Sequence, residues 1–372
     1  MTPHILSHDA YLRAVTLRDL TDPAQGPHAM QQLIDRITTA LRDRWGCAVR
    51  LHRAHPAVPV EHNYDRLHYP PDGAARDARY TRYVSETTVL RSQTSAMIPW
   101  LLRRVAADPP ADVLLACPGL VYRRDEIDRL HTGEPHQADL WRIVDGRVGI
   151  PELREMVEAV MDAVLPGRAY RLNTAAHPYT TDGLEMEVRA EDGWVEVGEC
   201  GLALPAILDE AGLPSTRWSG LAMGLGLDRL LMLAKGMDDI RALRSADPRI
   251  AAQMRDLEPY RPVSSQPPVR RDLSVAVDAA RTPEELGDRV RQALGVRAES
   301  LEAVEVVSET PYADLPPQAR ERIGIAPGQK NVLVRLVIRD LVRTLTSAEA
   351  NELRDAVYAA LHEGSAWQWA AA

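Results

Sequence analysis

Residues 113–144, "VLLACPGLVYRRDEIDRLHTGEPHQADLWRIV", decide how the first half of this chain folds. The runs "VLLAC", "LVYRR" and "LWRIV" are short and rich in Val, Leu and Ile, which predicts strands. Between them, from Arg123 to Asp139, most positions carry Arg, Asp, Glu or His. A surface loop would explain this polarity, but so would a binding site at the end of a buried strand.

The segments around this stretch predict further strands and helices. Residues 28–45 place apolar side chains on one helical face, and residues 151–165, "PELREMVEAVMDAVL", predict a helix that ends before Pro166-Gly167. Residues 184–200 alternate in polarity around Asp192-Gly193, which predicts a hairpin. We expect the glycine-rich segment 220–236, "GLAMGLGLDRLLMLAKG", to be a helix. Strands joined by hairpins favour an α+β fold with an antiparallel sheet flanked by helices.

A second domain is predicted after a break rich in Pro and Ser at residues 256–268. A strand "RDLSVAV" follows, and then a helix opened by a capping box of Thr282 and Glu285. Strands "LEAVEVV" and "NVLVRLVIRD" come next, and Thr346 and Glu349 open a last helix. This β-α-β-β-α order is typical of a ferredoxin-like sandwich. We therefore expect domains at residues 1–255 and 269–372, joined by the linker 256–268.

Composition indicates an ordinary protein of a reducing compartment. The chain has 372 residues, 45% of them hydrophobic, and no apolar run long enough to span a bilayer. The N-terminus lacks the pattern of a signal peptide, so we expect a cytoplasmic location. Cys47, Cys117 and Cys200 are isolated in the sequence, which supports neither a disulfide framework nor a structural zinc site.

The charges do not exclude nucleic acid as a partner. The net charge of -9 argues weakly against it, but Lys235 and Lys330 are the only lysines, so almost all positive charge is on arginine. Arginine is suited to bidentate contacts with phosphate. The chain also contains no Phe at all, although Leu, Val, Trp and Tyr are well represented.

Two segments in order resemble the signatures of a known family. "YRRDEIDRLHTGEPHQ" resembles the second signature of class II aminoacyl-tRNA synthetases in its phenylalanyl form, and "GLGLDRLLMLAKGMDDIR" resembles the third. "NYDRLHYP", "LRSQTSA", "PYTTDGLEMEV" and "WVEVGECGLALP" are similar to segments around the amino-acid pocket of that family. "PPVRRDLSVAV" and "RTLTSAEANELRDAVYAAL" resemble its ferredoxin-fold anticodon-binding domain.

The resemblance covers roughly residues 28–363 and implies a single-chain, mitochondrial-type phenylalanyl-tRNA synthetase that works as a monomer. It implies that ATP, Mg²⁺, an aromatic amino acid and tRNA, in particular tRNA-Phe, are bound. Activation requires the amino-acid carboxylate to attack the α-phosphate of ATP, so growing negative charge must be stabilised. Arg123 and Arg229 are implied as the catalytic phosphate clamps. The implied ATP-binding residues are Arg123, Glu126, His131, Pro135, Gly224, Gly226 and Arg229.

The resemblance also implies residues for the other ligands. Gln137 and Asp139 match the pair that fixes the substrate ammonium group, with Asp in place of the usual Glu. The implied amino-acid-binding residues are Gln93, Ser95, Gln137, Asp139, His177, Tyr179, Cys200 and Gly201. The implied Mg²⁺ ligands are Glu185, Glu187 and Glu196, and the implied tRNA contacts are Arg270, Arg271, Arg339 and Arg343. We reject a metal site at His131 and His136, because no third ligand lies at a suitable spacing.

The chain departs from the family where the family has Phe. His177-Pro178-Tyr179 replaces the Phe-Pro-Phe of the ring pocket, Pro135 replaces the Phe that stacks on adenine, and Tyr64 replaces another Phe. Loss of Phe from the whole chain favours pressure on Phe usage itself, as in an auxiliary synthetase or a deliberately Phe-free enzyme. Two other hypotheses remain open: a paralogue that activates tyrosine or a non-protein aromatic amino acid, and a catalytically inactive regulator that binds tRNA or an amino acid.

Overall fold

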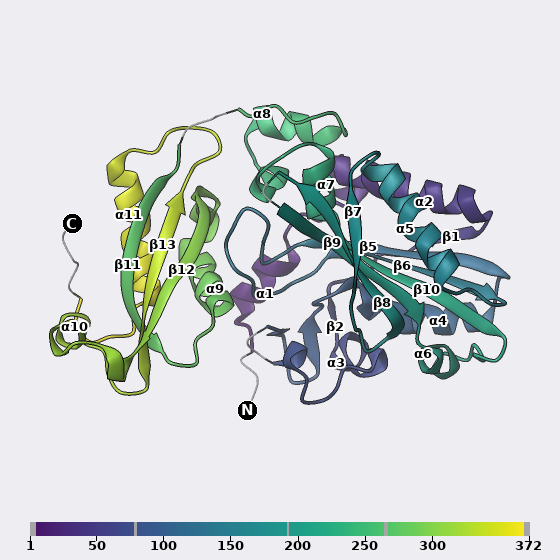
Figure 1. Cartoon of the computed structure of the whole chain (residues 1–372), viewed down its shortest axis with the longest axis horizontal. Helices are drawn as coiled ribbons and strands as arrows, with labels where there is room; N and C mark the ends of the chain where they lie inside the picture. Colours follow the sequence, from purple (N-terminus) through teal and green to yellow (C-terminus); the bar gives the residue numbers. More distant parts are fainter. Residues whose placement is uncertain (1–4, 78–79, 192, 264–266, 368–372) are drawn as a thin grey trace. The chain divides into compact units, whose positions relative to one another are not determined.

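The computed structural model describes residues 5–77, 80–191, 193–263 and 267–367. The chain forms two compact units, which are coloured along the sequence in Figure 1. The first unit comprises Met1–Arg123, Glu134–Asp238 and Ala251–Tyr260, and the second comprises Arg124–Gly133, Asp239–Ile250 and Arg261–Ala372. The second unit therefore includes two segments that come before residue 256.

The first unit is built on a seven-stranded sheet in the order β1-β5-β6-β10-β9-β8-β7. β1 is parallel to β5, and the other neighbouring strands are antiparallel. The strands are Ala48–Leu51 (β1), Asp112–Leu120 (β5), His136–Asp145 (β6), Tyr170–Thr174 (β7), Thr180–Ala190 (β8), Gly193–Ala203 (β9) and Trp218–Gly226 (β10). A small sheet contains Ala57–Pro59 (β2), Thr88–Leu90 (β4) and Arg82–Tyr83 (β3). The expected α+β fold with a mainly antiparallel sheet is confirmed.

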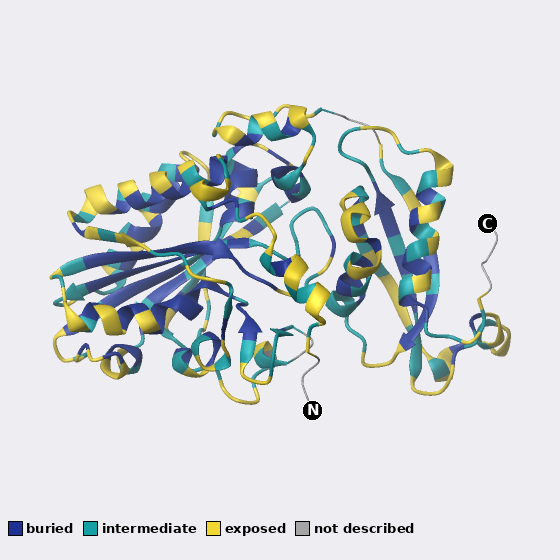
Figure 2. Ribbon diagram, turned by 180° about the vertical axis from the view of Figure 1, so that it is seen from behind, coloured by how far each residue is buried: buried dark blue, intermediate teal, exposed yellow. Residues whose placement is uncertain are grey.

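Helices cover both faces of the large sheet. Figure 1 shows α2 and α5 on one side of the sheet and α4 and α6 on the other. The helices of this unit are His8–Val15 (α1), Ala29–Trp45 (α2), Val60–Asn63 (α3), Ile98–Ala107 (α4), Ile150–Val164 (α5), Pro205–Glu210 (α6) and Leu227–Ala234 (α7). α4 and α6 pack on β5 and β6 through a core that includes Leu102, Trp141 and Ile207. Figure 2 shows the strands as a buried layer between these helices.

Local sequence signals account for several of these elements. α2 begins after His28, whose Nδ1 accepts from the backbone N–H of Met30, and ends at Gly46 in the left-handed conformation. α5 ends just before Leu165, as expected from the Pro-Gly pair that follows. The predicted hairpin is present as β8 and β9, with Gly193 at the start of β9 and Asp192 outside the described residues.

The prediction for the glycine-rich segment is wrong in its first half. Residues up to Gly226 form the central strand β10, and only Leu227–Ala234 form helix α7. Glycine is a poor helix former, and here β10 obtains backbone partners from both β6 and β9. The runs "VLLAC" and "LVYRR" likewise do not form separate strands, because β5 is continuous to Leu120 and residues 121–135 lie outside strands.

The second unit contains a three-stranded sheet in the order β11-β13-β12, with both pairs antiparallel. Its elements are Val269–Asp278 (β11), Pro283–Leu294 (α9), Leu301–Pro311 (β12), Pro317–Ile323 (α10), Gln329–Ile338 (β13) and Ser347–Leu361 (α11). α8 (Pro248–Ala251) precedes them in the chain. The capping boxes of Thr282 with Glu285 and of Thr346 with Glu349 are both confirmed.

Residues 124–133 join the core of the second unit, although they follow β5 in the sequence. Ile127 is 7% exposed and belongs to the hydrophobic cluster formed by β11, β12, β13, α9 and α11. Its carbonyl accepts a hydrogen bond from the backbone N–H of Val304 at 2.8 Å. A guanidinium N–H of Arg291 donates to the carbonyl of Asp125 at 2.5 Å. This polar stretch therefore has its own packing within the second unit.

None of the helices in the described part of the chain has the length and hydropathy needed to cross a membrane.

Candidate active site

On one face of the large sheet, a glycine of the central strand β10 lies between two carboxylate residues of the neighbouring strands. Cross-strand pairing aligns Asp139 on β6 with Gly224 on β10, and Gly224 with Glu199 on β9. Residues directly opposite one another in an antiparallel pair point to the same face. Because Gly224 has no side chain, the carboxyl groups of Asp139 and Glu199 stand on either side of an open strip.

We call this region the trough, and define it by three parallel rows of residues. The rows are Gln137 and Gly226 (row 1), Asp139, Gly224 and Glu199 (row 2), and Trp141, Ala222 and Gly201 (row 3). The floor of the trough is thus glycine or alanine at alternate positions of β10. This spacing matches the two-residue period of a strand, so one face carries small residues throughout.

The glycines of the sheet differ in what they allow. A Cβ atom placed on Gly224 would meet the Asp139 carboxylate only at 4.0 Å, so Gly224 leaves space. A Cβ on Gly198 would lie 2.3 Å from the carbonyl oxygen of Gly224, and one on Gly201 would lie 2.8 Å from Cβ of Thr180. Gly198 and Gly201 are therefore required by close packing between strands, whereas Gly224 opens the trough.

Asp139 is buried and hydrogen-bonded by the residues around it. Its carboxylate accepts from the hydroxyls of Thr94 at 2.8 Å and Ser95 at 2.9 Å, and from the indole N–H of Trp141 at 3.3 Å. Burial raises the pKa of Asp139, and the hydrogen bonds from Thr94 and Ser95 act against this rise. Ser95 thus lies at the trough, and its hydroxyl donates its hydrogen to Asp139.

Tyrosine side chains form an aromatic wall beside row 3. The ring of Tyr179 stacks on Trp141 with centroids 6.1 Å apart, and the ring of Tyr69 lies 6.2 Å from Tyr179. The Tyr69 hydroxyl donates to Oε1 of Gln93 at 2.9 Å. Burial raises the pKa of Tyr69 to about 12 and raises that of Tyr179 as well. Both phenols are therefore uncharged near neutral pH and supply polar edges to an aromatic wall.

His177 forms an ion pair with Glu199 at the other side of the trough. His177 lies in the loop between β7 and β8, and its Nε2 is 2.5 Å from Oε2 of Glu199. The His177 side chain is 15% exposed and that of Glu199 is 36% exposed. The ring of His177 is also 5.7 Å from that of Tyr179. His177 and Tyr179, which stand where the resemblance implies Phe, are therefore adjacent to each other. His177 also pairs with the carboxylate of Glu199.

The His177–Glu199 pair should make stability depend on pH. The hydrogen bond to Glu199 raises the pKa of His177, and the negative charges of Glu199, Glu196 and Asp139 act in the same direction, while burial opposes them. A histidine with a raised folded-state pKa adds stability that is complete below its unfolded pKa of about 6.5 and is lost as pH rises through the folded value. We expect His177→Asn to lower the free energy of unfolding more at pH 6 than at pH 9, in urea titrations at both pH values. Equal destabilisation at the two pH values would show that the pair is not charged.

Arg123 and Arg229, the implied phosphate clamps, both belong to the first unit. Arg123 follows β5, and its Nε donates to the Ser92 carbonyl at 2.8 Å. Burial raises the pKa of Tyr69, and the positive charge of Arg123 acts against this rise. Arg229 lies in the first turn of α7, three residues after Gly226, and donates to the carbonyl of Glu196 at 3.1 Å. Both guanidinium groups therefore belong to segments that adjoin row 1.

His136 connects the start of β6 to the start of α7. Its Nε2 accepts from the backbone N–H of Leu20 at 3.0 Å, so the proton of the ring is on Nδ1, which lies 3.2 Å from Asp228. The backbone N–H of His136 also donates to Asp228. Asp228 directly precedes Arg229, so this buried contact fixes the first turn of α7 beside Gln137.

Other predicted residues lie elsewhere. Cys200 pairs with Met223 in register and faces the opposite side of the sheet from Glu199, away from the trough. Burial raises the pKa of its thiol to about 12. The carbonyl of Pro135 accepts from the backbone N–H of Val121 at 2.9 Å and extends the pairing of β5 with β6. Glu126 and His131 belong to the second unit, where His131 lies 2.7 Å from Asp128.

The implied magnesium ligands are mostly paired with basic side chains. Glu187 accepts from Arg171 at 2.5 Å, and Glu196 lies 3.3 Å from Arg229. Glu185 lies 3.4 Å from the side-chain amide of Asn173. Within the described ranges, no group of three or more His, Cys, Asp or Glu side chains is placed to hold a metal ion. Mg²⁺ usually binds through one or two carboxylates plus substrate phosphates, which fits Glu196 beside Arg229 better than a site made by protein alone.

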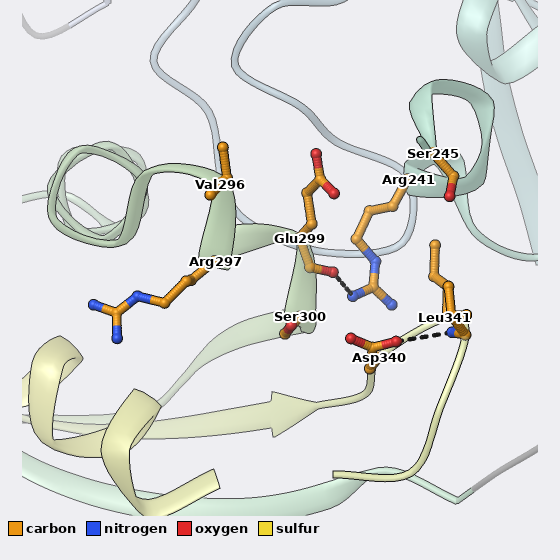
Figure 3. A pocket seen from close by; sticks show the side chains of 9 residues that line it. Arg241, Ser245, Val296, Arg297, Glu299, Ser300, Asp340 and Leu341 are labelled. Atoms are coloured by element: carbon orange, nitrogen blue, oxygen red, sulfur yellow. Dashed lines mark hydrogen bonds between the residues drawn. The ribbon is translucent and has the colours of Figure 1, made fainter. Parts of the chain in front are cut away.

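The arginines predicted to contact tRNA differ in their partners. Arg270 is exposed, whereas Arg271 donates to Asn351 at 3.0 Å. Arg339 lies 2.5 Å from Glu302, and Arg343 donates to Glu349 at 2.7 Å. The same unit contains a cavity of about 250 Å³. Figure 3 shows the side chains that line it, which include both basic and acidic residues. Its Arg241 donates to the carbonyls of Glu299 at 2.7 Å and Arg339 at 3.0 Å, so this guanidinium is satisfied by the protein.

Sequence reasoning missed Glu199, Tyr69, Thr94 and Trp141 as residues of the site. Glu199 lies inside the hairpin segment, where a carboxylate usually faces solvent, and Trp141 reads as an ordinary core residue. Alternation along β9 would place Glu199 and Gly201 on one face. The alternation alone could not predict the register between β9 and β10, which places Glu199 opposite Gly224.

Comparisons with known proteins show which family this chain resembles. The family model described as tRNA synthetases class II core domain (F) matches residues 15–254. A protein of Prochlorococcus marinus (strain MIT 9313), named Phenylalanine--tRNA ligase alpha subunit, is 35% identical over 238 residues, which are 63% of this chain and 69% of that protein. Probable phenylalanine--tRNA ligase, mitochondrial, of Drosophila melanogaster is 28% identical over 364 residues, which are 82% of this chain and 75% of the relative.

Two further matches cover a smaller share of this chain. The alpha subunit of P. marinus (strain NATL2A) is 35% identical over 192 residues, and the chain spans only 56% of its length. Among solved structures, Desulfitobacterium hafniense PylSc, a pyrrolysyl tRNA synthetase, aligns over 59% of this chain and 74% of its own, with a TM-score of 0.44 and 16% identity.

Proposed function

Because the chain belongs to the class II tRNA synthetases, we propose that it joins phenylalanine to tRNA-Phe in two steps that use ATP. In the first step, an oxygen of the amino-acid carboxylate bonds to the α-phosphorus of ATP. The bond from that phosphorus to the bridging oxygen of the β-phosphate breaks, and pyrophosphate leaves. In the second step, a ribose hydroxyl at the 3′ end of tRNA attacks the carbonyl of the adenylate, and AMP leaves.

The observation that carries this proposal is the order of chemical groups along the trough. Row 3, with Trp141 and Tyr179, suits an aromatic ring, and row 2 carries the carboxylates that suit an ammonium group. Row 1 lies next to Arg229, so a substrate carboxylate at Gln137 would meet the phosphates there. Phenylalanine has its ring, ammonium group and carboxylate in a compatible order. The names of the relatives that match this chain support phenylalanine as the amino acid.

The two arginines would stabilise charge without forming covalent bonds. Negative charge grows on the phosphoryl oxygens as the carboxylate attacks, and fixed guanidinium groups stabilise it most in the transition state. Arg123 and Arg229 are held in place by backbone carbonyls, so little reorganisation is needed when ATP binds. Magnesium bound with ATP would neutralise part of the phosphate charge, and Glu196 is the carboxylate best placed to hold it.

We also propose that the second unit takes part in tRNA recognition. The match to the Drosophila relative extends over 82% of this chain and thus beyond the core domain, which supports a single-chain enzyme. Arg270 on β11 is the best candidate for a phosphate contact, because the other three arginines have partners within the unit. We propose further that the protein acts as a monomer in the cytoplasm.

Pyrophosphate exchange tests the proposal directly. The purified protein is incubated with ATP, labelled pyrophosphate and one amino acid at a time from a panel of phenylalanine, tyrosine, tryptophan and leucine. We expect the strongest exchange with phenylalanine, and charging of tRNA-Phe transcripts with the same amino acid. Exchange with tyrosine but not with phenylalanine would contradict the substrate assignment, and no exchange with any amino acid would contradict adenylate formation.

A further inference from the structure

We propose that Glu199, held by His177, is the carboxylate that binds the α-ammonium group of the substrate, a role that Asp139 does not fill. This inference rests on the proposed activation of an amino acid. It concerns a group that all amino acids share, so it does not depend on which side chain the pocket accepts.

Asp139 has no acceptor site left for an ammonium group. A carboxylate offers about four lone-pair sites on its two oxygens. Asp139 already accepts from Thr94, from Trp141, and from both the hydroxyl and the backbone N–H of Ser95. It is also only 3% exposed. An ammonium group could reach it only by displacing one of these donors.

Glu199 has the capacity that Asp139 lacks. It occupies the same row of the trough, on the other side of Gly224, and its side chain is 36% exposed. In the described part of the chain, the structure pairs one of its oxygens with His177 and leaves acceptor sites on the other. His177 therefore fixes the direction of the carboxylate.

Both carboxylates lie in one row of the trough, near its aromatic wall. The negative charges of Asp139 and Glu199 each act on Tyr69 and on Tyr179, which form the aromatic wall. Successive rows of the trough are about 7 Å apart along the strands. An ammonium group at row 2 would leave the substrate ring near Trp141 and its carboxylate near Gln137. Glu199 thus stands at the level where the proposed substrate carries its positive charge.

The test compares Glu199→Gln with Glu210→Gln in pyrophosphate exchange. Glu210 is a matched control, because it also pairs with a histidine, His68, at 3.0 Å, but lies on α6 outside the trough. We expect Glu199→Gln to raise KM for phenylalanine by at least about tenfold, since a charge-assisted hydrogen bond is lost, while KM for ATP stays unchanged. Glu199→Asp, which keeps the charge, should recover part of the loss. Glu210→Gln should behave as the wild type.

Inhibition by L-3-phenyllactate separates recognition of the ammonium group from a general change in the pocket. Phenyllactate carries a hydroxyl in place of the ammonium group, so its inhibition constant should be the same in wild type and Glu199→Gln. An equal loss for phenylalanine and phenyllactate would overturn the inference, as would an unchanged KM. If Asp139→Asn, shown to be folded by circular dichroism, loses affinity for phenylalanine alone, the role belongs to Asp139.

Failure of the proposed function gives a different result. It would appear as a wild type that does not exchange with phenylalanine. The Glu199 comparison would then be made with the amino acid that the wild type does activate and with its α-hydroxy acid. If the wild type activated no amino acid, the inference would fall together with the proposed function.

Discussion

Replacement of Arg229 by alanine is expected to lower pyrophosphate exchange by about 10²–10³-fold, the range found when a fixed donor to a developing charge is removed. Arg229 sits in the first turn of α7 next to row 1, and its guanidinium is held by the backbone carbonyl of Glu196. The loss should appear in kcat/KM for ATP. The protein should stay folded, because Glu196 is 46% exposed and its carboxylate can be solvated once the arginine is gone.

Two further variants make this result specific. Arg229→Lys keeps the charge but not the two-pronged geometry of a guanidinium, so an intermediate loss is expected. Arg217→Ala is the control, because Arg217 is an exposed arginine that pairs with Asp145 on the same sheet, away from the trough. Exchange by Arg229→Ala within about threefold of the wild type would mean that this side chain does not contact the phosphates. Circular dichroism and thermal unfolding report whether each variant is folded.

Gly224→Val is expected to abolish exchange while leaving the fold intact. The new side chain would project from β10 between Asp139 and Glu199 and occupy the space that the substrate needs. The nearest atom to a new Cβ is the Asp139 carboxylate at 4.0 Å, and Val is well suited to a strand. We expect at least about a hundredfold loss in kcat/KM for the amino acid, because overlap with bound substrate removes most of its binding free energy.

Gly198→Ala is the matched variant with the opposite outcome for stability. A Cβ on Gly198 would lie 2.3 Å from the carbonyl oxygen of Gly224, which belongs to the neighbouring backbone. Strands must shift to accept it, and such overpacking typically costs about 1–3 kcal/mol. Thermal unfolding should therefore show a lower midpoint for Gly198→Ala than for Gly224→Val. If Gly224→Val were active with the wild-type KM, the trough would not be the amino-acid site.

Three of the residues that stand where the resemblance implies Phe are Tyr64, His177 and Tyr179, and the structure accommodates each in its own way. Tyr64 is buried, and its hydroxyl donates to the carbonyl of Ala75 at 2.9 Å, so the extra polar group is satisfied. Tyr179 keeps an aromatic ring against Trp141. His177 is the larger change, because it introduces a partner for Glu199. The replacements therefore preserve aromatic packing in one part of the pocket and alter its charge in another.

The sequence by itself determined the elements whose signals are local. The amphipathic period of residues 28–45, the hairpin at Gly193 and the capping boxes at Thr282 and Thr346 all appear in the structure. Caps and turns depend on hydrogen bonds between residues two to four positions apart, so a short stretch specifies them. The order of the charged stretch and the glycine-rich segment was sufficient to indicate the family, which the core-domain match confirms.

Only the tertiary structure decided what those segments do together. The glycine-rich segment gave no local reason to be a strand, and it became one because β6 and β9 supply partners on both sides. The same register brings residues 139, 224 and 199 into one row and turns Cys200 to the opposite face. Ile127 joined the core of the second unit for a similar reason, since its burial depends on strands more than 140 positions further along the chain. Contacts of this kind depend on how distant segments pair and pack, and a shift of one residue would turn each side chain to the other face.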